Sequence, residues 1–259
     1  MHPVLFTLPN GFAIHWYGFL IAAGTILAVV LATHWGKQAG LDKDLFTDIG
    51  FWAIFAGVVG ARLEYIRVNS DQFQTVQQMI NVRDGGLVYY GGLLAVLFAV
   101  GFIIWRKKLN PLKVLDVMAP TIPMGIIFGR MGCLFAGCCY GDRTDMPWAI
   151  TFPGQEGSAA PAGIPLHPTQ LYEVAYGAAL FGLLLWMRGR QRFEGQLFLT
   201  FLTLYPLLRS LNEVFRGDAG RGYFLEDVLG QTLSNAQFIS ILVAVSAGLG
   251  WAWLFRRNP

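Results

Sequence analysis

The stretch Ile14–Thr33 reads IHWYGFLIAAGTILAVVLAT and contains no Asp, Glu, Lys or Arg. A run of this length can cross the hydrocarbon layer of a membrane as one helix. Similar apolar runs follow at Asp48–Ile66, Leu87–Trp105, Val114–Phe128, Gln170–Met187, Gly195–Leu211 and Asn235–Phe255. With 54% hydrophobic and 14% charged residues among 259, the composition lies outside the range of soluble domains. The sequence therefore predicts an all-α polytopic membrane protein with about seven transmembrane helices.

Lys and Arg divide unevenly between alternate loops, and cytoplasmic loops hold the excess of these residues. The richer side receives Lys37, Lys43, Arg106, Lys107, Lys108, Lys113, Arg188, Arg190, Arg192, Arg256 and Arg257. This division predicts an N-terminus outside and a C-terminus in the cytoplasm. We interpret the net charge of +3 mainly as basic residues that anchor the inner surface to anionic membrane lipid. We predict no nucleic-acid partner.

The longer connections fall on the predicted outer side, at residues 67–86, 142–168 and 216–234. Frequent Gly, Pro and Ala within 142–168 predict irregular backbone, which is tolerated at a membrane where water or protein covers it. We expect these connections to form arm and cap elements of a single membrane domain over residues 1–259. The cap would be small, irregular and outside the cell membrane, and the functional site would lie toward it.

Three arginines, Arg62, Arg130 and Arg209, lie at or inside the ends of apolar runs. A fixed charge is costly to hold at such a position and commonly serves a ligand. All three fall on the same predicted side of the bilayer. The pattern predicts an anion-binding site.

A second pattern is the spacing of Tyr205, Arg209, Glu213 and Arg216, which puts the four residues on one face of a helix. Glu213 can then bridge Arg209 and Arg216 and fix their guanidinium groups for bidentate contact with phosphate oxygens. A purely structural ion pair at a helix end explains the same spacing. Both interpretations stay open at this point.

Two tyrosines, Tyr89 and Tyr90, precede the glycine pair Gly91 and Gly92 at the start of the third run. Glycines there allow close approach of backbone or lipid. A tyrosine hydroxyl can hydrogen-bond a headgroup or relay a proton, whereas an interfacial aromatic belt accounts for one tyrosine of the two. Tyr17, at the outer start of the first run, raises the same question.

The three cysteines, Cys133, Cys138 and Cys139, lie in one short segment. With His167 they match a zinc pattern only weakly, because adjacent cysteines do not easily point at one ion together. Cys133 can instead form a disulfide with Cys138 or Cys139, or all three can be small packing residues. We predict no metal, and packing or a disulfide for these cysteines.

Taken together, the motifs resemble the bacterial prolipoprotein diacylglyceryl transferases along nearly the whole chain. The likeness is carried by Ile14–Gly18, Gly60–Arg62, Asp84–Leu87 with Gly91–Leu93, Asp116 with Ala119–Pro120, Gly129–Gly132, His167–Glu173 and Arg209–Arg216. The resemblance implies seven spans in the bacterial inner membrane, no cofactor, and transfer of diacylglycerol from phosphatidylglycerol to the lipobox cysteine of a preprotein. Glycerol 1-phosphate would be released.

The resemblance and the arginine pattern together assign roles to the candidate residues. The expected catalytic residues are Arg130, Arg209, Tyr90 and Glu213; the expected substrate-binding residues are Tyr17, Arg62, Gly91, Gly92, Gly141, His167, Tyr205 and Arg216. Arg130 and Arg209 would bind the phosphodiester and stabilise charge on the leaving phosphate.

Two departures from the family pattern concern the base that deprotonates the thiol. Tyr90 stands where members commonly carry histidine before a glycine pair, and Gly132–Cys138 reads GCLFAGC in place of a Gly-Asn-Phe-x-Asn-Gly-Glu signature. Either Tyr90 substitutes for the histidine, or His167 or His15 acts instead, or catalysis depends chiefly on arginines. The alternative function is a non-catalytic or re-purposed paralogue that binds phospholipid or lipoprotein.

Overall fold

The computed structural model describes residues 2–9, 11, 13–73, 75–81, 86–154, 158–217, 223–228 and 231–257. Contacts group the chain into two compact units, one formed by residues 1–28 with 115–259 and the other by residues 29–114. The two boundaries fall inside helices, one in α1 (Trp16–Gln38) and the other in α5 (Pro111–Met118). The single membrane domain over residues 1–259 stays a prediction.

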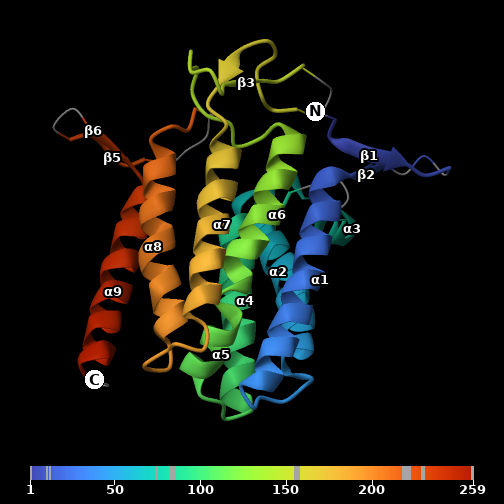
Figure 1. Ribbon diagram of the computed structural model, residues 1–259. Coiled ribbons are helices and arrows are strands. Elements are labelled where there is room, and N and C mark those ends of the chain that lie inside the picture. Colours follow the sequence, from blue (N-terminus) through green and yellow to red (C-terminus); the bar gives the residue numbers. More distant parts are fainter. Residues whose placement is uncertain are drawn as a thin grey trace. The chain divides into compact units, whose positions relative to one another are not determined.

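The first unit is built mainly from long helices that are consecutive in sequence (Figure 1). α6 (Thr121–Ala136) packs on α7 (Thr169–Met187), α7 on α8 (Gln196–Glu213), and α8 on α9 (Asn235–Arg257). Leu180 and Leu184 of α7 and Leu197 and Phe201 of α8 are buried in one hydrophobic cluster. This cluster holds the C-terminal part of α7 against the N-terminal part of α8.

Three short antiparallel hairpins also belong to this unit. They pair β1 (Val4–Thr7) with β2 (Ala13–His15), β3 (Ile150–Thr151) with β4 (Pro165–Leu166), and β5 (Tyr223–Val228) with β6 (Gln231–Ser234). The sequence analysis did not predict them, because runs this short show no clear alternation of apolar and polar residues.

A buried carboxylate holds the start of α8. Asp116, on α5 (Pro111–Met118), accepts hydrogen bonds from the backbone N–H groups of Gly195 at 2.7 Å and Phe198 at 3.0 Å. The first N–H groups of a helix have no partner within the helix, so this carboxylate satisfies two of them. Gln191 donates a third hydrogen bond to it at 3.1 Å. Asp116 therefore anchors the connection between α7 and α8.

The second unit contains α2 (Leu45–Val68), η1 (Ser70–Gln72), α3 (Val76–Ile80) and α4 (Tyr89–Arg106). α2 and α4 pack closely through glycines: a Cβ atom on Gly91 would lie 2.5 Å from the carbonyl oxygen of Gly60, and the reverse contact is equally short. Only residues without a side chain allow backbones this near. Lys107 donates to Asp48 at 2.9 Å, and this hydrogen bond raises the pKa of the lysine.

In the part of the chain that the structure describes, five helices, α1, α2, α4, α7 and α9, are long and apolar enough to cross a membrane. α5 and α6 reach that standard together but are bent by 40°, which gives up to six spans if the pair counts as one. Pro120 stands at this break and lacks the N–H group that would continue the helix. In the described residues α8 does not meet the standard, so the predicted count of seven is not reached. The chain is nonetheless a multi-pass membrane protein.

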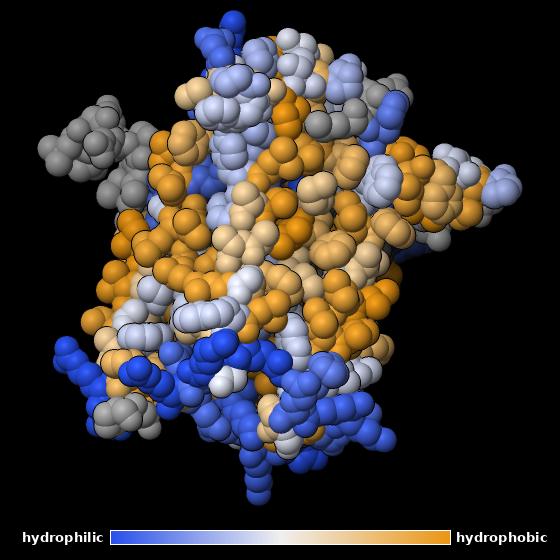
Figure 2. Space-filling view, viewed as in Figure 1, coloured by the Kyte–Doolittle hydropathy of each residue, from blue (hydrophilic) through white to orange (hydrophobic). Residues whose placement is uncertain are grey.

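Exposed apolar side chains agree with this class. On α9, Leu242, Val245, Leu249 and Trp253 share one face and are each more than half exposed. Figure 2 shows hydrophobic side chains over the middle of α8 and α9 and hydrophilic ones near the C-terminal end of α9. A stripe of this kind on a helix is covered by lipid in a membrane protein.

Candidate active site

Glu173 of α7 is the centre of a buried polar network in the first unit. Its carboxylate oxygen Oε2 lies 3.0 Å from Nε of Arg130 on α6, and the side chain of Glu173 is 1% exposed. The hydroxyl of Tyr205 donates to Oε1 at 3.0 Å and the amide of Asn212 to Oε2 at 3.3 Å. Two helices, α6 and α8, therefore supply the partners that this buried carboxylate needs.

Arg130 keeps most of its hydrogen-bonding capacity. Within the described residues its one ion pair is made through Nε, and its side chain is 19% exposed. A guanidinium group carries five N–H donors in a planar fork that fits two oxygens of a phosphate or carboxylate. The terminal nitrogens Nη1 and Nη2 can therefore bind an anion while Nε holds the pairing with Glu173.

The predicted cluster on α8 is confirmed in part. Arg209 donates through Nη1 to the carboxylate of Glu213, one turn further on, and Glu213 is 4% exposed. Arg216 follows the end of the helix, where its N–H group donates to the carbonyl oxygen of Glu213 at 3.2 Å. A side-chain bridge from Glu213 to Arg216 stays a prediction.

Gly141, His167 and Arg216 come together from three separate segments. The N–H group of Gly141 donates to the carbonyl of His167 at 3.0 Å, and Gly141 pairs with Arg216 as an antiparallel bridge. A Cβ atom at residue 141 would lie 2.6 Å from the carbonyl oxygens of both His167 and Phe215. Only glycine fits at this position, where three chain segments pack closely together. Direct substrate contact by Gly141 stays a prediction.

His167 takes part in an aromatic and hydrogen-bonded group. Its Nδ1 lies 3.0 Å from the hydroxyl of Tyr172, and Trp148 donates to the same hydroxyl at 2.8 Å. Phe215 packs at 5.2 Å from the imidazole, measured between ring centroids. These contacts fix the orientation of the His167 ring.

The loop that follows α6 is tied to the start of α7. Thr169 donates through its hydroxyl to the carbonyl of Cys139 at 2.7 Å, and Gln170 donates through its amide to the carbonyl of Cys138 at 2.8 Å. Asn212 donates to the carbonyl of Thr169 at 3.2 Å and so connects this loop to the Glu173 network. The buried oxygens Oε1 of Gln170 and Oδ1 of Asn212 have no partner among the described residues, as happens often at functional sites.

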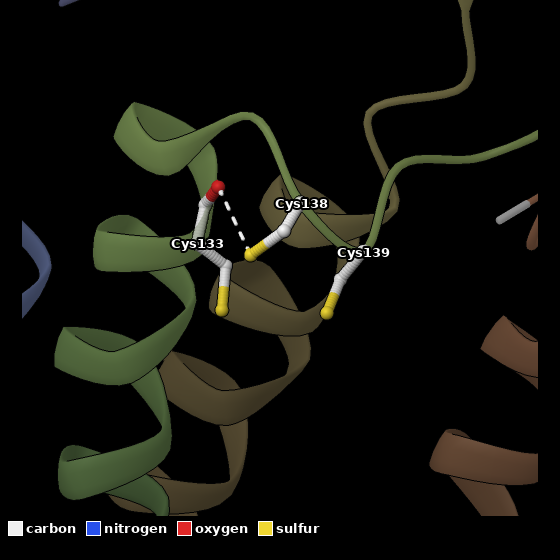
Figure 3. A group of neighbouring side chains, drawn as sticks. All are labelled: Cys133, Cys138 and Cys139. Carbon is white, nitrogen blue, oxygen red and sulfur yellow. Dashed lines mark hydrogen bonds between the residues drawn. The ribbon is translucent and has the colours of Figure 1, made fainter. Parts of the chain in front are cut away.

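The three cysteines lie side by side (Figure 3), with their Sγ atoms all within 4.8 Å of one another and no disulfide between them. The expectation that adjacent cysteines do not point at one place was wrong. Cys139 has a φ of 59°, and this left-handed backbone breaks the alternation of side chains found in an extended chain.

The environment of the thiols differs between Cys138 and Cys139. Hydrogen bonds from Cys133 and Cys138 stabilise the thiolate of Cys139 and lower its pKa, and the charges of Arg130 and Arg216 act in the same direction. Hydrogen bonds with Cys133 and Cys139, together with burial, raise the pKa of Cys138. The positive charges of Arg130 and Arg216 therefore favour the thiolate form of Cys139.

Tyr17 lies in the same unit, at the start of α1. A Cβ atom on Gly132 of α6 would lie 3.1 Å from the Cα atom of Tyr17, so the two helices touch here. Beside this contact, Trp16 stacks on Phe135 with ring centroids 4.9 Å apart. The side chain of Tyr17 is half-exposed. A contact between Tyr17 and substrate stays a prediction.

The remaining candidates belong to the second unit. Arg62 donates to the carbonyls of Met79 at 2.8 Å, Gly86 at 3.0 Å and Gln78 at 2.7 Å. Gly91 and Gly92 face the backbone of α2, and Tyr90 is 52% exposed beside Tyr89. In this unit Arg62 and the two glycines therefore have structural partners. Their contact with substrate, and that of Tyr90, stays a prediction.

Glu173, Asn212, Thr169 and Gln170 were not among the candidate residues. Glu173 is the last residue of the motif His167–Glu173, which contributes to the family resemblance. This motif is the sequence feature that could have identified Glu173 as a site residue. A carboxylate in an apolar run is costly unless an opposite charge or a hydrogen-bond donor pairs with it, as is also true of the three arginines. The arginine that pairs with Glu173 could not be predicted from the sequence, because Arg130 and Glu173 lie on different helices.

Fold and site together define a multi-pass membrane protein with a buried arginine–carboxylate centre. The family described as prolipoprotein diacylglyceryl transferase matches residues 3–253, and the chain belongs to this family of enzymes. The chain is similar to proteins named phosphatidylglycerol–prolipoprotein diacylglyceryl transferase in three bacteria. In Clostridium tetani the identity is 33% over 245 residues, covering 95% of this chain and 94% of the relative.

The other two relatives are equally extensive matches. The Clostridioides difficile protein is 32% identical over 260 residues, covering 100% of this chain and 97% of the relative. The Geobacter sulfurreducens protein is 34% identical over 244 residues, covering 92% of this chain and 91% of the relative. The likeness therefore includes both units of the structure.

Proposed function

We propose that this chain transfers the diacylglyceryl group of phosphatidylglycerol to the lipobox cysteine thiol of prolipoproteins. The observation that carries the proposal is Arg130, whose Nε is paired with buried Glu173 while Nη1 and Nη2 remain available for a phosphate. The family membership and the printed names of the relatives support the choice of lipid and acceptor.

The reaction is a substitution at the glycerol carbon that bears the phosphate. The acceptor thiol loses its proton, its sulfur forms a carbon–sulfur bond, and the carbon–oxygen bond to phosphate breaks. The products are a thioether and glycerol 1-phosphate. Negative charge moves onto the leaving phosphate, so donors aimed at that group stabilise the transition state more than the ground state.

Arg130 and Arg209 are suited to this electrostatic role. Each is paired with a buried carboxylate, Glu173 and Glu213 respectively, and each side chain is less than one-fifth exposed. In a site that excludes water such charges act more strongly than at a surface. Because both carboxylates are occupied by arginine, neither is suited to take the proton of the thiol. This arrangement favours catalysis that depends chiefly on arginines.

We further propose seven spans in the bacterial inner membrane, with α8 as an additional span beside α7 and α9. The last turns of α8 carry Arg209, Asn212 and Glu213, whose polar groups have partners inside the first unit. The N-terminus would lie outside and the C-terminus, after Arg256 and Arg257, in the cytoplasm. The site would face the outer leaflet.

The test is the mass of a lipobox peptide after incubation with the purified protein and phosphatidylglycerol in detergent. We expect a gain of one diacylglyceryl group, absent when the peptide carries Ser in place of its cysteine and much reduced with phosphatidylethanolamine. No gain in any preparation, with binding of phosphatidylglycerol retained, would overturn the transferase and support the non-catalytic paralogue.

A further inference from the structure

We propose that Cys133, Cys138 and Cys139 form a three-thiolate site for a thiophilic d¹⁰ metal ion such as Zn²⁺. We also propose that the open fourth position of this ion takes the acceptor thiol. The second part rests on the proposed function, whereas the first does not. The assignment comes from the three Sγ atoms, which all lie within 4.8 Å of one another.

The spacing of the sulfur atoms suits one ion. Zinc binds thiolate sulfur at about 2.3 Å, and three sulfurs at that distance from one ion lie about 4 Å apart. The Sγ atoms need only small side-chain rotations to reach this arrangement. Figure 3 shows Cys133 on α6 and the other two on the following loop, with their sulfur atoms gathered in one space.

The backbone of the loop is already held in the required form. Gly137 ends α6 in the left-handed conformation, with a φ of 65°, and the N–H group of Cys138 donates to the carbonyl of Cys133 at 3.1 Å. Thr169 and Gln170 hold the carbonyls of Cys139 and Cys138. These bonds use backbone atoms. The sulfurs contact one another, and Cys138 Sγ also lies 3.7 Å from the carbonyl oxygen of Cys133.

The ligand set selects the kind of metal. In the described part of the chain no histidine or carboxylate joins the group, so all three ligands are sulfur. Soft thiolates prefer zinc or copper(I) to magnesium or calcium, which take oxygen ligands. Three thiolates and Zn²⁺ carry a net charge of −1, and the positive charges of Arg130 and Arg216 act on this place.

An ion with three protein ligands would also solve the problem of the missing base. Catalytic zinc sites keep one position open, and a thiol that coordinates there is deprotonated outright. The proton passes to solvent, the bound sulfur attacks the glycerol carbon, and glycerol 1-phosphate leaves with the electrons of the broken carbon–oxygen bond. The metal keeps its oxidation state throughout. Arg130, three residues before Cys133 on α6, would hold the leaving phosphate next to the nucleophile.

The first experiment measures metal binding alone, so it is independent of transfer activity. Reduced, metal-free protein in detergent is titrated with Cd²⁺, and thiolate-to-metal charge-transfer absorption is recorded together with the metal content. We expect about one ion per chain. Cys138→Ser and Cys139→Ser should each weaken binding about 10-fold or more. Met118→Leu, which removes a sulfur outside the group, should not.

Unfolded variants are excluded by their thermal unfolding and by retained phosphatidylglycerol binding. A reduced wild-type chain that takes up no more Cd²⁺ than the variant with all three cysteines changed to serine would overturn the site. So would a disulfide, in place of any metal, in protein isolated from membranes without reductant.

The second experiment tests the open position. Adding a lipobox peptide to Co²⁺-loaded protein should increase the thiolate absorption with the cysteine peptide and leave it unchanged with the serine peptide. Since a free thiol with a pKa of about 8.5 is only a few per cent thiolate at neutral pH, metal removal should lower kcat/KM about 10-fold and Zn²⁺ should restore it. Unchanged transfer by the metal-free chain would overturn this part and leave the transferase intact.

Discussion

Two arginines, Arg62 in the second unit and Arg130 in the first, look alike in the sequence and differ in the structure. Each lies near one end of a membrane-length apolar run, close to glycine. Arg62 donates from Nε, Nη1 and Nη2 to three backbone carbonyls, and its guanidinium carbon lies 5.4 Å from the ring centroids of Tyr65 and Phe73. Arg130 pairs with one carboxylate through Nε.

The difference teaches how to separate a structural arginine from a binding one. At Arg62 all three nitrogens have protein acceptors, so the charge holds the chain between α2 and α4 in place. At Arg130 the ion pair uses one nitrogen, and the side chain is 19% exposed. The position of an arginine in an apolar run is therefore less informative than the number of its nitrogens that protein atoms already occupy.

The largest expected effect tests this difference with one substitution made at both positions. Arg130→Lys keeps a positive charge beside Glu173 but loses the planar fork, so we expect kcat to fall about 10²-fold. Arg62→Lys should leave the turnover of each folded molecule within about 3-fold of the wild type. The measurement is the rate of diacylglyceryl transfer to a lipobox peptide, divided by the folded fraction.

The partner of Arg130 provides the next test. Glu173→Gln leaves a buried guanidinium without its counter-charge, and we expect a loss of about 3 kcal/mol in the free energy of unfolding. The matched control is Glu64→Gln, which breaks an ion pair with Arg67 in the second unit. That pair is exposed, so its loss should not change the unfolding midpoint measurably. Equal shifts for the two variants would contradict the importance of the buried pair.

The stability of the second unit tests whether Arg62 has a structural role or a substrate-binding role. Lysine offers three donors from one atom and cannot reach three separated carbonyls with good geometry. We expect Arg62→Lys to lower the free energy of unfolding by about 2 kcal/mol. Proteolysis between residues 68 and 88 should increase in parallel. Unchanged proteolysis with a raised KM for phosphatidylglycerol would instead make Arg62 a lipid-binding residue.

The smallest expected effect concerns Tyr205. In Tyr205→Phe the carboxylate of Glu173 loses one hydrogen bond of 3.0 Å but keeps Arg130 and Asn212. We expect a cost of about 1 kcal/mol, which corresponds to about a 5-fold lower rate if the whole loss appears in the transition state. A fall as large as that of Arg130→Lys would show that Tyr205 itself contacts the reacting groups.

Helix prediction succeeded where length and composition were sufficient. The run predicted at Asn235–Phe255 is α9, Asn235–Arg257, because an isolated apolar segment of this length forms one helix. The run Val114–Phe128 instead crosses the break at Pro120, so it belongs to two helices. Pro120 is visible in the sequence, and a proline inside an apolar run predicts a break in the helix.

The site was harder to predict because its pairs join distant segments. The pair Arg209 and Glu213 lies on one helix and followed from spacing alone. Arg130 was identified, but its partner Glu173 was not, since the contact depends on how α6 and α7 pack. The approach of Cys139 to Cys133 depends on two left-handed residues, Gly137 and Cys139, and no periodic pattern encodes that conformation.

The most direct measurement compares Arg130→Lys with Arg62→Lys in one transfer assay, using the mass of the lipobox peptide and equal amounts of folded protein. The account predicts that peptide is modified by Arg62→Lys at nearly the wild-type rate and by Arg130→Lys about 10²-fold more slowly. Normal transfer by Arg130→Lys would contradict the central role given to Arg130, and loss of transfer in folded Arg62→Lys would contradict the structural role given to Arg62.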